Sequence, residues 1–73
     1  MYSTQTALSM MQFNWECAKR QSATGRLDQF QAGMLAGHIH VWAVIAGTNG
    51  AYRTGTLMAT RIIQLASRGK YDE

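Results

Sequence analysis

The sequence has no proline, a single cysteine and only four carboxylate side chains. Because hydrophobic content is also high, the absence of proline indicates an ordered chain outside its ends. The lone Cys17 excludes an internal disulfide, and no spacing of His, Cys, Asp or Glu matches a structural metal site. Glu16 and Asp28 lie in different segments, while Asp72 and Glu73 end the chain, so no pair of carboxylates is placed for acid–base chemistry. We therefore expect a protein that is not an enzyme and that uses no cofactor or metal.

Charge is missing from the middle of the chain. Between Asp28 and Arg53, 24 consecutive residues include no Asp, Glu, Lys or Arg, and Phe30–Gly47 is the most apolar stretch of the molecule. Such a stretch has to be covered by the chain itself, by another copy, by a partner or by a membrane. Gln31 and two histidines interrupt it, and the flanking segments are amphipathic, so a membrane is the least favoured of these covers.

The chain of 73 residues is expected to form a single domain. A core of this size offsets the entropy of folding only narrowly, and with no disulfide or metal available the remaining stabilising device is self-association, which predicts a homodimer. The net charge of +3 permits an acidic partner or nucleic acid without requiring either. The first residues lack the basic and apolar regions of a signal peptide, which points to the cytoplasm.

Apolar residues recur every three or four positions in three segments, which predicts an all-α fold. Ser3 or Thr4 can cap the first helix, and Gly25 can end it in the left-handed conformation. Thr24 can cap the second helix, with Asp28 in its first turn. The expected bounds are about 4–21, 26–46 and 51–67, followed by a loose tail at 70–73.

An α+β alternative remains open at this stage. His38–Ile45 is rich in residues that favour strands, and Asn49-Gly50 is the preferred turn of a two-residue hairpin. Against a hairpin stands the spacing of three and four residues, which begins at Leu27 and continues without interruption.

The second segment carries an apolar stripe spaced like one side of a coiled coil. Its glycines leave flat patches where another backbone can approach closely, so we expect the stripe to form a dimer or core seam. The seam residues are Leu27, Phe30, Gly33, Met34, Gly37, Val41 and Val44.

Two histidines, His38 and His40, interrupt this segment. Residues two apart on a helix point about 200° away from each other and cannot share a metal ion. The plain interpretation is a hydrogen-bonded core or interface histidine. The sharper one is a pH-sensitive dimer contact, in which association weakens toward pH 5.

Basic residues and one tyrosine are the candidates for contact with a partner. A Tyr–Arg pair suits a protein-binding hot spot, and arginines suit phosphate or an acidic protein. These candidates are Tyr52, Arg53, Arg61, Arg68, Lys19, Arg20 and Arg26.

A tiny helical chain with no active site resembles, in organisation and not in sequence, the accessory proteins of phages and other mobile elements. That resemblance implies a non-enzymatic module that binds and inhibits or modulates a host protein. Two alternatives stay open: a small basic regulator associated with nucleic acid, and a small structural subunit of a larger assembly.

Overall fold

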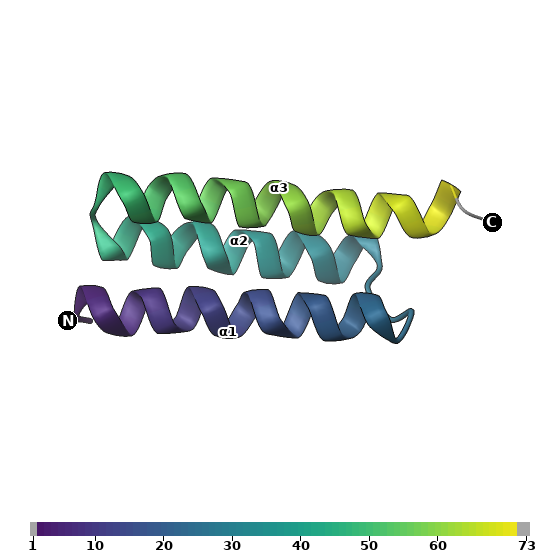
Figure 1. Cartoon of the computed structure of the whole chain (residues 1–73), viewed down its shortest axis with the longest axis horizontal. Helices are drawn as coiled ribbons and strands as arrows, with labels where there is room; N and C mark the ends of the chain where they lie inside the picture. Colours follow the sequence, from purple (N-terminus) through teal and green to yellow (C-terminus); the bar gives the residue numbers. More distant parts are fainter. Residues whose placement is uncertain (1, 72–73) are drawn as a thin grey trace.

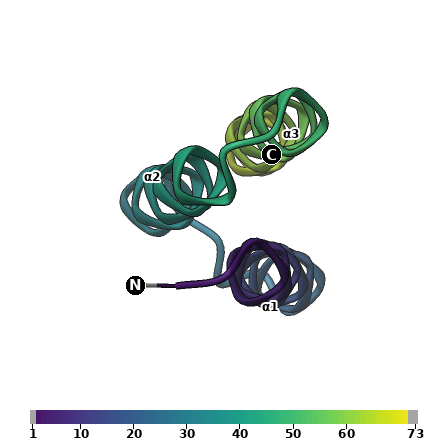
Figure 2. The same cartoon turned by 90° about the vertical axis from the view of Figure 1, so that its left-hand side faces the viewer.

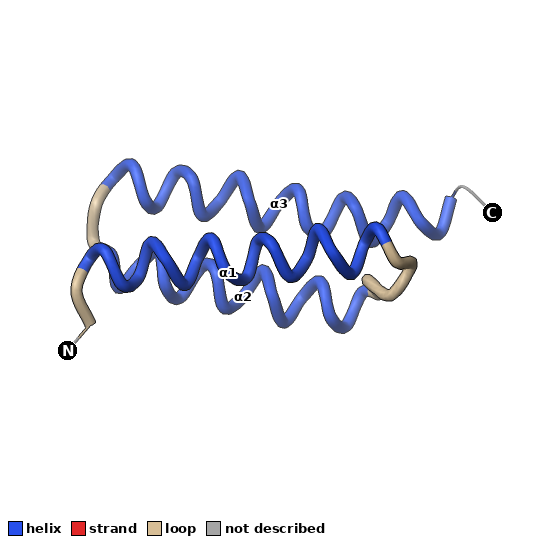
Figure 3. Tube along the Cα trace, turned by 60° about the horizontal axis from the view of Figure 1, so that its bottom comes forward, coloured by secondary structure: helices blue, strands red, loops and turns tan. Residues whose placement is uncertain are grey.

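The computed structural model describes the backbone of residues 2–71 and the side chains of residues 2–67. Three helices, α1 (Thr4–Ala23), α2 (Gln29–Ala46) and α3 (Asn49–Tyr71), run antiparallel to their sequence neighbours along a narrow bundle (Figure 1). Every regular element of the described residues is helical (Figure 3). The all-α prediction is confirmed, and the α+β alternative is wrong.

Local caps set the start of α1 and the connection between α1 and α2. The Ser3 side chain accepts a hydrogen bond from the amide of Thr6 at the start of α1. Gly25, at φ 73°, adopts the left-handed conformation that ends a helix. Asp28, and not Thr24, caps α2, because its carboxylate accepts from the amide of Gln31 at 2.7 Å. The second helix therefore begins three residues later than expected.

The connection between α2 and α3 explains why no hairpin forms. Gly47, at φ 73°, ends α2 in the left-handed conformation. The Thr48 hydroxyl then accepts from the amide of Ala51 at 3.0 Å, so Asn49 and Gly50 fall in the first turn of α3. Helix α3 consequently starts two residues before its expected bound and runs to Tyr71. The expected loose tail at 70–73 stays a prediction, and residues 72–73 of it lie outside the described residues.

The core is made mostly of alanine. Met11, Ile39 and Ile62 are the large side chains that it buries fully, and eight alanines fill the rest. Small core residues bring helix axes close together, and Gly55 marks a close approach of α3 to α2, since a Cβ there would lie 2.7 Å from the Cβ of Ala43. The alanines are Ala7, Ala18, Ala32, Ala36, Ala43, Ala46, Ala51 and Ala66.

Helix α2 packs against both other helices, whereas α1 and α3 contact each other over much less of their length (Figure 2). At the end of the bundle the Thr4 hydroxyl donates to the carbonyl of Ala46 at 3.1 Å, which ties the start of α1 to the end of α2. None of the described helices is long and apolar enough to span a bilayer.

The face of α2 that enters this core is not the expected seam. The buried positions are Ala32, Leu35, Ala36, Ile39, Ala43 and Ala46. The seam residues lie instead on the opposite side of the helix: Phe30 is 75% exposed, Val41 and Val44 are more than half exposed, and only Leu27 packs partly against the core. As a core seam the prediction is wrong, because α2 is apolar on two sides and the alanine-rich side packs closest. As a dimer seam it stays a prediction.

Candidate functional site

Two surfaces of the bundle stand out. The first, the α1/α3 groove, lies between α1 and α3 and is lined by residues of both helices. The second, called the α2 outer face, lies on the other side of the bundle. It comprises Phe30, Gly33, Met34, Gly37, Val41, Val44 and Ile45, all of them exposed.

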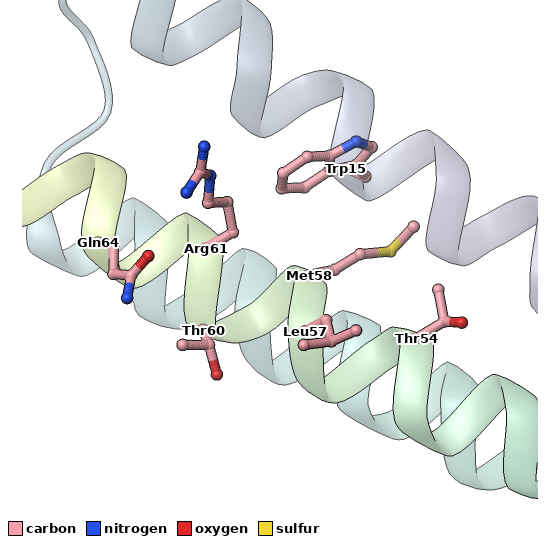
Figure 4. A pocket seen from close by; sticks show the side chains of 7 residues that line it. All are labelled: Trp15, Thr54, Leu57, Met58, Thr60, Arg61 and Gln64. Atoms are coloured by element: carbon pink, nitrogen blue, oxygen red, sulfur yellow. The ribbon is translucent and has the colours of Figure 1, made fainter.

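The α1/α3 groove has an apolar floor. Trp15, half-buried on α1, and Met58, half-buried on α3, both pack against the core and extend toward each other across the groove (Figure 4). Leu57, 67% exposed, borders it, although its spacing predicts a place on the inner face of α3. The hollow has a volume of about 480 Å³. Its lining residues are Trp15, Thr54, Leu57, Met58, Thr60, Arg61 and Gln64.

The rim of the groove is cationic. Arg61 extends from α3 toward Trp15 (Figure 4), and a second hollow of about 340 Å³ continues the groove past Arg61 to Lys19. The Nζ atom of Lys19 lies 5.6 Å from the centroid of the Trp15 ring, within range of a cation–π interaction. Among the described residues, Lys19 forms a salt bridge with Glu16 at 3.0 Å.

Glu16 and Lys19 are coupled electrostatically. A hydrogen bond from Lys19 is the main cause that lowers the pKa of Glu16 below its ordinary value, and the charge of Lys19 and a 2.8 Å hydrogen bond from Gln12 act in the same direction. Since the pKa is lower in the folded chain, the stabilisation is present at neutral pH and is lost as the pH falls through the folded-state pKa.

We expect the Glu16 carboxyl to titrate below its ordinary value in the intact protein and to move back toward that value in Lys19→Met, which removes the donor and the charge. The measurement is the carboxyl carbon shift of Glu16 followed by NMR across the acid range. Arg20→Met is the matched control and should move the midpoint less, because Arg20 is the weakest of the causes. Equal midpoints in the wild type and Lys19→Met would contradict the pairing.

The structure separates the predicted contact residues into three places. Lys19 and Arg61 meet at the groove. Tyr52 and Arg53 line a shallower hollow of about 390 Å³ at the start of α3, where the Tyr52 ring stands edge-on to His40 with centroids 5.9 Å apart. The remaining two described candidates, Arg20 and Arg26, are exposed near the first connection, while the side chain of Arg68 lies outside the described residues.

The two histidines are exposed on different sides of α2. They do not form a core contact, and the pH-sensitive dimer contact remains a prediction. In the part of the chain that the structure describes, no three His, Cys, Asp or Glu side chains gather where a metal ion could bind.

The sequence does not predict the α1/α3 groove, because the residues that line it share no sequence pattern. Trp15 lies on an apolar stripe and Met58 on another, so each is expected in the core. Their partly exposed sides form a shared surface only because the fold places α1 beside α3. Arg61 was identified as a contact candidate, but its proximity to Trp15 depends on the packing of two helices far apart in the sequence.

Comparison with known proteins gives no family: no family model matches the chain, and neither does a curated protein or a solved structure. Its function therefore has to be argued from these two surfaces.

Proposed function

We propose that the chain is a non-enzymatic protein-binding module that inhibits or modulates a partner protein, and that it acts as a helical homodimer. The observation that carries the proposal is the α1/α3 groove, with Trp15 and Met58 on its floor and Arg61 and Lys19 on its rim. Partly buried aromatic side chains beside arginine are the usual hot spots of protein interfaces.

The chemistry of the groove selects one kind of occupant. An apolar floor between two helices accepts the apolar side of a third helix, with anchors three and four residues apart. The cationic rim favours acidic residues along the edges of that helix, because Arg61 has no carboxylate partner among the described side chains. The proposed partner segment is therefore an amphipathic helix flanked by Asp or Glu.

The placement of the arginines speaks against a nucleic-acid surface. A phosphate-binding surface gathers its cations on one face. Here Arg20 lies in the last turn of α1 and Arg26 in the connection to α2, whereas Arg53 lies in the first turns of α3. The start of α3 and the connection between α1 and α2 lie at opposite ends of the bundle (Figure 1). Binding of nucleic acid is accordingly an outcome that the experiment has to exclude.

The test is capture of a protein from a bacterial lysate by the immobilised chain, after nuclease treatment, compared across three forms. We expect the wild type to retain a stoichiometric protein, Arg61→Glu to lose it, and Arg26→Glu to keep it. Both variants change an exposed arginine to the same acid, so only their location differs. Circular dichroism of each variant verifies that it is folded.

Two results would overturn the proposal. One is a captured protein that binds Arg61→Glu as well as the wild type. The other is captured material that disappears with nuclease and falls steeply with salt, which is the behaviour of phosphate contacts.

A further inference from the structure

The α2 outer face gathers several exposed apolar side chains on one side of a single helix. Phe30, Met34, Val41, Val44 and Ile45 all rank among the exposed large apolar side chains of the protein. The largest contiguous apolar patch of a monomer typically covers about 300–600 Å² and is often a functional surface. The face is therefore a candidate contact surface, and its charge, its spacing and its area indicate which occupant it fits.

Charge favours a second copy of the same chain. The protein has a net charge of +3, so two copies repel unless they meet where neither is charged. Helix α1 carries Glu16, Lys19 and Arg20, and α3 carries Arg53 and Arg61, but no Asp, Glu, Lys or Arg lies between Gln29 and Ala46. Helix α2 is thus the one described helix that can face its own copy without opposing like charges.

The sequence spacing of the residues on the α2 outer face favours one relative direction of the two paired helices. Positions 30, 33, 37, 41 and 44 are separated by three, four, four and three residues, a series that is the same from either end. With a twofold axis at Gly37, an antiparallel pair places Phe30 opposite Val44 of the second copy, and Gly33 opposite its Val41. In a parallel pair, Phe30 would face Phe30 and Gly33 would face Gly33. The two large rings would then crowd each other, and the two glycines would leave a void between the helices.

Local geometry permits the close approach at the axis. A Cβ at Gly37 or at Gly33 would meet nothing within 4 Å in the single chain, so these glycines leave open space that another backbone can enter. Antiparallel helices also place their opposite dipole ends side by side, which is favourable.

The apolar area that two copies would bury indicates how tightly they are expected to bind each other. At about 100 Å² for each large apolar side chain, the five of this face bring about 500 Å² per copy. Two copies then bury on the order of 1,000 Å², which lies at the lower limit of specific interfaces. The dimer is expected to dissociate on dilution.

We infer that two copies of the chain pair through the α2 outer face as an antiparallel, twofold-symmetric dimer whose axis passes beside Gly37. The inference deepens the proposed function, of which the homodimer is a part. It leaves the α1/α3 groove of each copy uncovered on the far side, so the dimer presents two identical binding grooves.

Disulfide cross-linking tests the direction. In a Cys17→Ser background, Phe30→Cys with Val44→Cys should form a covalent dimer under mild oxidant, while either cysteine alone should not. The two positions are about 21 Å apart along one helix, so they cannot join within a chain. Covalent dimers from the single-cysteine variants would show a parallel pair and overturn the inference.

Sedimentation equilibrium tests the surface. Gly37→Leu should weaken dimerisation at least tenfold and keep its helical circular dichroism, whereas Gly50→Leu, another glycine with open space around it, should dimerise like the wild type. A wild type that stays monomeric at every concentration, or a Gly37→Leu variant with unchanged association, would overturn the inference. Capture by the groove is read separately from Arg61→Glu, so failure of the dimer and failure of partner binding are distinguishable.

Discussion

Replacing Ile39 with Ala is expected to lower the free energy of unfolding by about 3 kcal/mol, within the range for a buried Ile. Ile39 is fully buried on the core side of α2 and is one of three large side chains that the core encloses. Domains of this size respond to such a loss with a drop in Tm of about 12–24 °C. Since small domains have little stability to lose, the variant should be partly unfolded at 37 °C.

The measurement is thermal and urea unfolding followed by circular dichroism, at a concentration where the chain is monomeric. Val44→Ala is the matched control: it also replaces a β-branched residue of α2, but one that is mostly exposed. Both changes gain the same kind of helix propensity, so the difference between them isolates burial. Similar losses of stability in the two variants would show that the wrong side of α2 has been placed in the core.

The second large loss of stability is expected when Gly55 is replaced, because α3 lies close to α2 at this residue. A Cβ there would lie 2.7 Å from the Cβ of Ala43 and 3.4 Å from the Cε of Met11. Neither helix can yield at a Cβ without moving its backbone, so Gly55→Ala should cost about 1–3 kcal/mol of overpacking. Alanine normally brings a gain of about 1 kcal/mol to a helix, so the net loss in the free energy of unfolding is expected to reach about 2 kcal/mol. Gly55→Leu should prevent native packing altogether.

A double-mutant cycle makes this prediction specific. Adding Ala43→Gly to Gly55→Ala exchanges the small and large partner and removes the clash, so the double variant should be more stable than the sum of the single changes predicts. Gly50→Ala, which meets no neighbouring atom, should be neutral or stabilising. If Gly55→Ala proved as stable as Gly50→Ala, the two helices could not be as close as described.

Three helices could be predicted from the sequence because their apolar spacing, Ser3, Gly25 and Gly47 all act within a few residues. The side of α2 that enters the core could not. Phe30, Val41 and Val44 are more apolar than Ala32, Ala36 and Ala43, and hydrophobicity alone assigns the larger residues to the inside. The structure uses the alanine side because small residues permit the closest packing of three helices, a property of the assembled bundle.

The candidate site was predictable only in part, for a similar reason. The sequence indicates Arg61 and Lys19 as candidates for contact with a partner, but their common location depends on the placement of α1 beside α3. The Trp15 side chain packs partly against the core and also lines the groove. The spacing of apolar residues assigns each residue to one face of a helix, so it does not predict such a double role.

The way in which α2 packs between its two neighbours also bears on how the chain folds. Its closest contacts join helices that are adjacent in the sequence, and the pair farthest apart, α1 and α3, contacts least. Proteins dominated by such local contacts close short loops and fold within microseconds to milliseconds. Helices α2 and α3 can thus associate before α1 docks. Amide hydrogens of α1 are accordingly expected to exchange with solvent sooner than those of the α2–α3 pair.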